Sequence, residues 1–356
     1  MSRPATPEAK PSNADESATV DVAASDNGRQ VTLHDVARLA GLSAMTAWRA
    51  VNTPDKVPAA TVARVQDAVA RSGYVPNLVA GGLRSRKSKL VAALVPTVAG
   101  PVFLETIESL TSELAARGYQ LMLGQSGYRE SREDALINAI VGRRPDGIVL
   151  TGILHSPAGR KRLQAARIPV VETWDLTDTP IDMVVGFSHA DVGTAVGRYL
   201  MARGRKAPAL IGGDDERALR RMNAFVAEVQ AHGVNDVPRK TVKAPSTLGQ
   251  GRLALRELLK ERPDLDAVFC TSDFLALGVL TEAQAQGIAV PGRLAVVGFG
   301  DLAFASDLNP ALTTVRIDGT RIGKLAAAFL VNTAAGEPQT ERIIDVGFRI
   351  VERDSA

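Results

Sequence analysis

The stretch VTLHDVARLAGLSAMTAWRAVN, residues 31–52, decides the fold of the N-terminal part of the chain. Its first half repeats apolar residues at helical spacing, and Gly41 follows the last of them. Because glycine takes the left-handed backbone conformation without steric cost, we expect the first helix to end there. Ser43 is a suitable N-cap for a second helix over residues 44–51. Two short helices joined by a glycine turn predict a helix-turn-helix motif.

The charge around this motif is strongly positive. Residues 30–89 contain nine Lys and Arg against three Asp and Glu, a net charge of +6, whereas residues 1–29 carry −2 and the whole chain +3. A basic module on a nearly neutral body is typical of a domain that binds DNA phosphates and places its second helix in the major groove. The alternative is a helical hairpin within another kind of domain, with a solvated basic face.

A third amphipathic helix is expected over residues 59–72, and YVPNLVAGGLRSRK follows at residues 74–87. With the first motif, this segment resembles the LacI family of bacterial transcription regulators. The family pattern has a TLxDVAxxAGVSxxTVSRVxN headpiece and a GYxPNxxAxxL hinge, and this chain matches nearly all of it. The resemblance covers residues 31 to about 350. Residues 1–29, rich in Ala, Ser, Pro and acidic residues, are expected to form a disordered tail.

The resemblance implies which residues of the headpiece, residues 30–76, contact DNA. The base-reading positions fall on Ala44 and Met45, with Arg49 as a third reader. Arginine can bind guanine through two hydrogen bonds, and the apolar side chains can contact a thymine methyl group. The positions that contact phosphate or brace the helix are Leu33, Ser43, Thr46 and Asn52.

Two residues depart from the family pattern beside the third reader. The usual Thr-Val-Ser triplet is Thr46-Ala47-Trp48 here, so a core valine is replaced by alanine and a small serine by a large ring. Trp48 either packs on the sugar-phosphate backbone or fills the space left by Ala47. The sequence favours neither alternative.

The hinge and linker occupy residues 77–89. In the family, two subunits place short hinge helices side by side in the minor groove, and the resemblance assigns the wedging residue to Leu83, with help from Ala80 and with Asn77 at the helix start. The glycine pair after Ala80 weakens such a helix by about 1 kcal/mol per residue. We therefore expect it to fold only on DNA; a plain interdomain linker is the alternative.

From residue 90 onward, near-continuous apolar runs alternate with helical segments. The expected strands are 90–96, 119–125, 146–151, 168–173, 183–187, 208–213, 266–272 and 294–301, and the expected helices are 103–117, 131–143, 190–203, 217–232, 250–260 and 274–286. Alternation of this kind predicts an α/β architecture with parallel strands covered on both faces.

The resemblance makes the fold class more specific: an N-terminal all-α helix-turn-helix headpiece plus an α/β, two-lobed, periplasmic-binding-protein-like effector domain. This effector-binding and dimerisation domain spans residues 90–350. Its lobes are expected at about 90–188 with 316–341, and at 189–315 with the final segment. Residues 351–356 are expected to form a C-terminal tail.

Ligands of such folds lie beyond the carboxyl ends of the strands. The family cleft positions fall on Phe103 and Phe187 as walls, Arg217 and Arg221 on one helix face, Ser272 and Asp273 at a strand end, Asp301 beside the usual carboxylate position, and Ser246 in place of a stacking ring. Two arginines and the loss of that ring favour an acyclic, acidic polyol.

Several segments, among them GYQLML at residues 118–123 and Asp215-Glu216-Arg217, resemble the gluconate-utilisation repressor branch of the family. We therefore expect gluconate or a related sugar acid, such as a keto-gluconate or its phosphate, as the effector. Two alternatives stay open: a neutral sugar as effector, and arginines that form a solvated helix face paired with Asp214, Asp215 and Glu216.

Other classes of protein are disfavoured. The glycine motifs lack the spacing of a P-loop or a nucleophile elbow, and the four histidines lack metal-ligand spacing, so neither an enzyme nor a cofactor or metal site is expected. Cys270 lies in an apolar run and is expected to be a packed thiol. The absence of a long apolar run or a signal segment predicts a cytoplasmic, nucleoid-associated protein with no membrane contact.

The expected partners are palindromic double-stranded operator DNA, a small sugar or sugar acid, and a second copy of the chain. The chain has no leucine heptad after residue 341, which favours a homodimer over a tetramer. The main rival is a sugar-binding protein without a role on DNA, and an enzyme is more distant.

Overall fold

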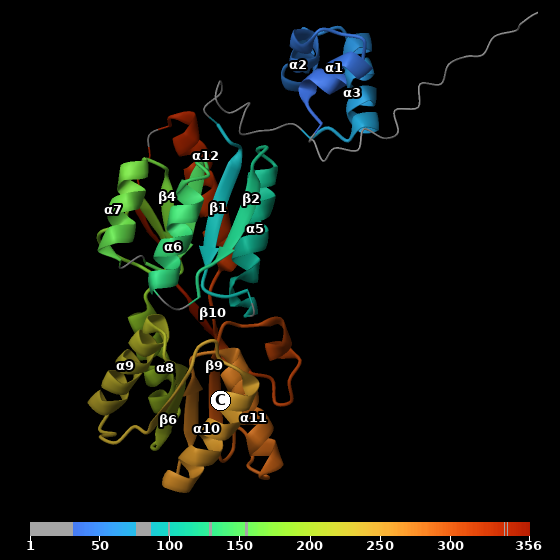
Figure 1. Ribbon diagram of the computed structural model, residues 1–356. Helices are drawn as coiled ribbons and strands as arrows, with labels where there is room; N and C mark the ends of the chain where they lie inside the picture. The colour runs from blue at the N-terminus through green and yellow to red at the C-terminus, as the bar shows by residue number, and fades with distance from the viewer. Residues whose placement is uncertain are drawn as a thin grey trace, which may run out of the picture. The chain divides into compact units, whose positions relative to one another are not determined.

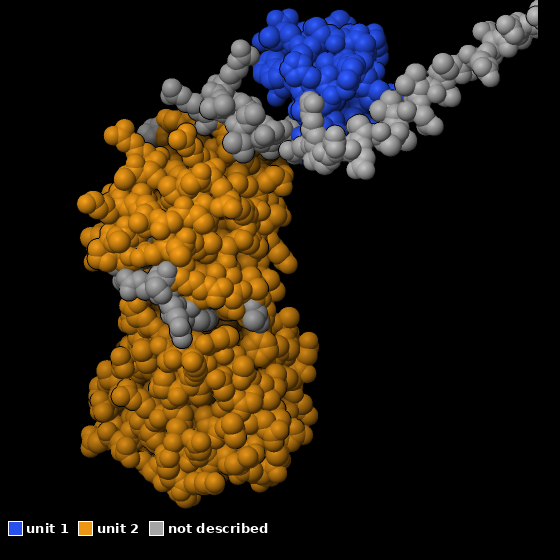
Figure 2. Space-filling model, viewed as in Figure 1, with its two compact units in different colours: residues 1–83 blue, residues 84–356 orange. Residues whose placement is uncertain are grey.

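The computed structural model describes residues 31–75, 87–98, 100–127, 130–153, 156–337, 339 and 341–356. The chain divides into two compact units, residues 1–83 and residues 84–356 (Figure 2). The expected tail at residues 1–29 and the three hinge residues Asn77, Ala80 and Leu83 lie outside the described residues.

The first unit contains the predicted three-helix headpiece. Helix α1 (Leu33–Leu39) leads through Gly41, whose φ is +63°, to α2 (Ala44–Asn52), and α3 (Ala59–Ser72) follows a short 3₁₀ turn, η1 (Pro54–Lys56). Arg64 of α3 donates a hydrogen bond of 2.6 Å to the carbonyl of Ala40, which fixes the turn between α1 and α2. The buried core of the unit is built from small apolar side chains: Val36, Ala37, Ala40, Ala47, Ala50, Val65 and Ala68.

The second unit begins with a lobe built on a parallel six-stranded sheet (Figure 1). Its strands, in the order β11-β5-β4-β3-β1-β2, are β11 (Ile343–Asp345), β5 (Met183–Gly186), β4 (Val170–Thr173), β3 (Gly147–Thr151), β1 (Leu90–Val95) and β2 (Gln120–Gln125). Residues of β1 alternate between two cores. Val91 and Ala93 face α5 (Leu104–Ala115) and α12 (Gly319–Ala335), whereas Ala92 and Leu94 face α6 (Glu130–Val141) and α7 (Pro157–Ala166).

The second lobe repeats this arrangement. Its sheet has the order β12-β10-β9-β8-β6-β7 and consists of β12 (Arg349–Val351), β10 (Thr313–Arg316), β9 (Ala295–Phe299), β8 (Ala267–Cys270), β6 (Pro208–Gly213) and β7 (Arg239–Val242). Only the pairing of β12 with β10 is antiparallel among these described strands. Helices α8 (His189–Ala202) and α9 (Glu216–Ala231) pack as one pair, and α10 (Leu248–Glu261) and α11 (Asp273–Ala285) as another.

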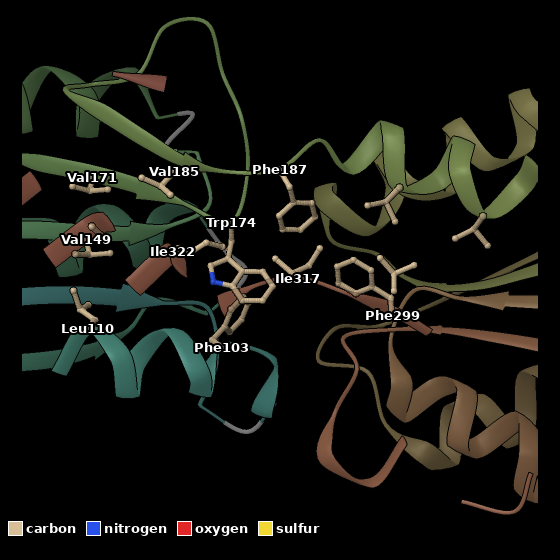
Figure 3. Packing of buried hydrophobic residues seen from close by; sticks show 14 of the residues in the cluster. Phe103, Leu110, Val149, Val171, Trp174, Val185, Phe187, Phe299, Ile317 and Ile322 are labelled. Atoms are coloured by element: carbon tan, nitrogen blue, oxygen red, sulfur yellow. The ribbon is translucent and has the colours of Figure 1, made fainter. Parts of the chain in front are cut away.

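The chain passes between the two lobes three times, after β5, after β10 and after β11, because the elements before and after each point belong to different lobes. One apolar core continues through these crossings, and Figure 3 shows Phe103, Trp174, Phe187 and Phe299 gathered there. The carboxyl ends of the parallel strands of both sheets therefore meet around the crossings, where the fold predicts a ligand site.

The strands and helices expected within the described residues are all present, but these residues contain more elements than the sequence predicted. The four short strands β7, β10, β11 and β12 and the helices α7 and α12 were missed. Strand β11 pairs with β5, so the first lobe extends beyond residue 341. Two 3₁₀ turns, η2 (Pro101–Phe103) and η3 (Ala303–Ser306), precede α5 and follow β9.

The prediction that residues 351–356 form a C-terminal tail is wrong. Ser355 is fully buried; its hydroxyl donates to the carbonyl of Val296 at 2.6 Å and accepts from the backbone N–H of Thr313 at 2.8 Å. These bonds tie Ser355 to strands β9 and β10 of the second sheet, so the last residues are part of that lobe. No helix among the described residues has the length and apolar character needed to span a membrane.

Candidate functional site

The second helix of the headpiece presents the predicted DNA-contacting residues. Ser43 caps it, as predicted, by accepting a hydrogen bond from the backbone N–H of Thr46 at 3.2 Å, and the two hydroxyl groups are 2.8 Å apart. Met45 is 52% exposed, and Arg49 is also exposed. The start of α2 is therefore open on the side that a base-reading helix needs.

The other predicted contact residues are placed around this open face. Ala44 is half-buried, Leu33 packs against the headpiece core from the start of α1, and Asn52 is exposed and donates to the carbonyl of Trp48 at 2.9 Å. Ala47 is fully buried in the core, whereas Trp48 is half-buried and is not among the side chains that pack on that core in the described headpiece. Contact of Trp48 with the DNA backbone stays a prediction.

The second unit has a cavity of about 110 Å³ between its two lobes. Five of the eight predicted effector residues line it: Phe103, Arg217, Arg221, Ser246 and Ser272. Phe103 comes from the first lobe and the other four from the second, so the cavity requires both lobes.

Helix α9 places both arginines in this cavity. Asp215 caps the helix by accepting from the N–H of Ala218 at 3.1 Å, and four-residue spacing then puts Arg217 and Arg221 on one face. Gly193 of α8 brings the two helices close together, because a Cβ atom there would lie 2.1 Å from the carbonyl oxygen of Arg221. The close packing buries Arg221, which is only 5% exposed.

Arg221 is held by neutral groups. Its Nη1 is 2.8 Å from Nδ1 of His189, its Nη2 donates to the carbonyl of Thr271 at 3.2 Å, and its guanidinium lies over the ring of Phe299 with 4.0 Å to the centroid. Its Nε has no hydrogen-bond partner in the described structure. Burial lowers the pKa of Arg221 to about 10, which reflects a cation removed from water without an ion-pair partner.

The acidic residues nearby compensate the two arginines only in part: Asp215 pairs with Arg217, and Asp215 and Asp175 raise the pKa of Arg221 against the larger, lowering effect of burial. Among the described residues no carboxylate forms an ion pair with Arg221, and the only one for Arg217 is with Asp215 at 3.9 Å. Asp214 instead accepts from the N–H of Ala244 at 2.8 Å, and Glu216 lies 3.7 Å from Arg220. Arg217 thus has the Asp215 partner that the alternative of a paired arginine face expects, whereas Arg221 is buried away from such a face.

Three predicted effector residues lie outside the cavity lining. Phe187 is fully buried behind it and packs edge-on against His189. Asp273 accepts hydrogen bonds from Thr314 and from the N–H of Leu302 beneath the floor, and burial raises the pKa of Asp273 to about 6. The carboxylate of Asp301 pairs with Arg316 and with Arg353 instead, so it is turned toward other parts of the second lobe.

Several residues that line the cavity were not predicted from the sequence. Trp174 follows β4, has a φ of +65° and meets Phe103 edge-to-face, while its Nε1 donates to Thr106 at 3.0 Å. His189 follows β5, and Thr97 follows β1. Their common position after the carboxyl end of a strand is the signal that could have identified them.

A wider hollow of about 580 Å³ adjoins the cavity and shares Asp215, Arg217 and Ala244 with it. Its wall includes an ion pair between the lobes: Asp175, which is 2% exposed, accepts from both Nη atoms of Arg220. Asp175 of the first lobe is thus bound to Arg220 of α9.

The headpiece and the two-lobed cavity together define a DNA-binding regulator with an attached binding domain. Residues 32–77 match the family model for bacterial regulatory proteins of the lacI family, and residues 198–356 match the periplasmic binding protein-like domain. The HTH-type transcriptional regulator GntR of Pseudomonas aeruginosa is 35% identical over 326 residues, which cover 91% of this chain and 95% of that protein. This chain therefore belongs to the LacI family of bacterial transcription regulators.

Solved structures agree with this assignment. A LacI-family transcriptional regulator from Silicibacter pomeroyi is 31% identical with a TM-score of 0.86, over 91% of this chain and 99% of that one. The transcription regulator GntR from Chromobacterium violaceum is 39% identical with a TM-score of 0.72, over 75% of this chain and 98% of that one. The predicted fold class, headpiece plus periplasmic-binding-protein-like domain, is confirmed.

Proposed function

We propose that this regulator represses genes of sugar-acid catabolism and that gluconate, a keto-gluconate or a gluconate phosphate, bound between the lobes, controls its contact with DNA. The observation that carries the proposal is the buried guanidinium of Arg221, which forms no direct ion pair with a carboxylate of the described residues and whose pKa burial lowers to about 10. A bound carboxylate would supply a direct ion-pair partner for this guanidinium, which lines the cavity.

The remaining lining supports an acyclic polyol attached to that carboxylate. Hydroxyl groups of Ser246, Ser272 and Thr97 and the carboxylate of Asp215 can exchange hydrogen bonds with polyol hydroxyls. The guanidinium of Arg221 covers one face of the Phe299 ring, so a sugar ring cannot stack on that face. Trp174 and Phe103 form an aromatic wall, and this wall is the observation that favours a neutral sugar as the alternative effector.

On the DNA side, we assign base reading to Ala44, Met45 and Arg49 and backbone contact to Ser43, Thr46, Trp48, Asn52 and Leu33. Exposure of Met45 and Arg49 on α2 supports this assignment. Two headpieces in a homodimer would read a palindrome, with Asn77, Ala80 and Leu83 in the intervening minor groove. An operator affinity that falls steeply with salt would distinguish this role from that of a sugar-binding protein without DNA contact.

Calorimetry with a ligand panel tests the effector. We expect gluconate to bind at least tenfold more tightly than glucitol, which has the same chain without the carboxylate, because a charge-assisted hydrogen bond contributes about 1.5–3 kcal/mol. Arg217→Met should reduce this preference, whereas Arg198→Met should leave it unchanged because Arg198 is 67% exposed on α8. Tight binding of a neutral pentose or hexose, with no response to gluconates, would refute the proposal.

A second measurement tests whether the effector weakens or strengthens DNA binding. Fluorescence anisotropy with a labelled palindrome from the upstream region of its own gene should show weaker DNA binding when gluconate is added, if the effector is an inducer. Tighter binding would make gluconate a corepressor and would still support the effector assignment. Sedimentation in the presence of that palindrome should show two copies of the chain per site.

A further inference from the structure

His189 is the residue that joins the buried arginine to the first lobe. It lies at the start of α8, just after the first crossing between lobes, and is 3% exposed. Its Nε2 is 2.9 Å from the carbonyl oxygen of Trp174 and its Nδ1 is 2.8 Å from Nη1 of Arg221. A chain of hydrogen bonds therefore runs from a lining residue of the first lobe to the arginine in the second.

The partners of the ring determine its protonation. A guanidinium has only donors, so Nδ1 must be the unprotonated acceptor, and a carbonyl oxygen only accepts, so Nε2 must carry the proton. His189 is thus neutral. The low pKa of His189, held well below its usual value by burial and by Arg221, agrees with this geometry.

A neutral acceptor has a consequence that a carboxylate would not have. An aspartate or glutamate at this position would also direct Arg221, but it would cancel the positive charge in the cavity and repel an anionic ligand. An imidazole directs the guanidinium through one lone pair and leaves its charge available. The two bonds to His189 and Thr271 use one N–H on each Nη atom, and Arg221 lines the cavity, so its charge and the second N–H of each Nη atom are not used by these two partners.

We propose that neutral His189 is a positioning residue that directs Arg221 into the cavity without neutralising it, and thereby makes the site selective for a carboxylate over the corresponding neutral polyol. This inference rests on the proposed sugar-acid effector for its choice of ligands. The positioning itself does not depend on the effector.

Three substitutions of His189 distinguish the orientation of Arg221 from the effect of the charge at position 189. His189→Asn places an oxygen near the position of Nδ1 and remains neutral, so it should still direct Arg221. His189→Asp has nearly the same shape as His189→Asn but is anionic, and His189→Phe has no acceptor. The His189→Asn and His189→Asp variants both lose the bond to the Trp174 carbonyl, so a difference between their ligand affinities reports the effect of charge alone. His232→Asn is the matched control, because His232 is half-exposed beyond the end of α9.

The first measurement is the ratio of gluconate to glucitol affinity, determined by calorimetry at pH 7.5. We expect His189→Asn and His232→Asn to stay within about threefold of the wild-type ratio, and His189→Asp and His189→Phe to lower it by at least tenfold, the scale of one charge-assisted hydrogen bond. An unchanged ratio in His189→Asp or His189→Phe would overturn the inference. An equal loss in His189→Asn and His189→Asp would also overturn it, because charge would then play no part.

The second measurement is the position of Arg221 in crystal structures of the full-length variants. The guanidinium should keep its bond to the Thr271 carbonyl and point into the cavity in His189→Asn, and should turn away in His189→Phe. An unmoved Arg221 in His189→Phe would refute the positioning role. A wild-type gluconate to glucitol ratio near one would refute the effector proposal and the selectivity claim together, whereas these crystal structures decide the positioning role separately. Far-ultraviolet circular dichroism of each variant verifies that it is folded.

Discussion

Replacing Arg221 by methionine should leave the protein at least as stable as the wild type while removing its response to sugar acids. Arg221 is 5% exposed and has no carboxylate partner in the described chain. A fall in the pKa of Arg221 from its ordinary value to about 10 corresponds to about 3 kcal/mol of free energy lost by placing the charge in this site. Methionine fills a similar volume without a charge.

Two acceptors limit the gain. Nδ1 of His189 and the carbonyl of Thr271 each lose a donor when Arg221 is replaced, at a cost of about 1 kcal/mol each. The expected net change is therefore a gain of about 1 kcal/mol in the free energy of unfolding, or about 2 °C in Tm for a unit of this size. Uncompensated buried charges replaced by apolar side chains commonly behave in this way.

Urea denaturation followed by circular dichroism measures the change, and Arg198→Met serves as the control. Arg198 pairs with Glu228 but is 67% exposed, so its loss should change the free energy of unfolding by less than about 0.5 kcal/mol. Gluconate at a hundred times its Kd should stabilise the wild type by about 2.7 kcal/mol and the Arg221→Met variant by almost nothing. A loss of more than 2 kcal/mol in Arg221→Met would refute the reasoning, because it would mean that the protein already compensates the charge.

Three more outcomes are expected. Arg220→Gln deprives the buried Asp175 of its partner across the lobes, so it should lower the free energy of unfolding by about 2 kcal/mol in urea and weaken gluconate binding in calorimetry. The pKa of His189 lies below its unfolded value of 6.5, so stability is fully present above pH 6.5 and is lost as the pH falls below it; wild type should therefore lose more stability than His189→Asn between pH 7.5 and 5.5. Arg64→Ala removes the bond to the carbonyl of Ala40 and should weaken operator binding in anisotropy assays without altering gluconate affinity.

Local sequence signals predicted the headpiece and most of the sheet because each of these elements is determined by its own residues. Gly41 and Ser43 mark the ends of α1 and α2 through backbone conformation and capping, which need no distant partner. The short strands were missed for the opposite reason. β11 and β12 have three residues each and are strands only because β5 and β10 supply a neighbour.

The cleft was predicted less completely because its lining depends on where strand ends meet. Arg217 and Arg221 share a helix face by spacing alone, so the sequence was sufficient to pair them. Asp273 also follows a strand end, but its carboxylate turns beneath the floor toward Thr314. The role of His189 arises from a contact with Trp174 across the crossing, and no local pattern encodes such a contact.

Contacts of the α9 arginines with the first lobe suggest how ligand binding moves the lobes. Moving a two-state equilibrium from 1:99 to 99:1 requires about 5.5 kcal/mol of preferential binding to one state. One charge-assisted hydrogen bond supplies about 1.5–3 kcal/mol, which is too little alone. Arg217, 3.5 Å from the Thr151 carbonyl, and Arg220, bound to Asp175, both reach the first lobe, whereas Arg221 is linked to it through His189. Because both arginines lie on α9, a carboxylate bound to them favours closed lobes only through the contacts of Arg217 and His189 with the first lobe, so Arg217→Met should reduce the change in operator affinity more than it reduces effector binding.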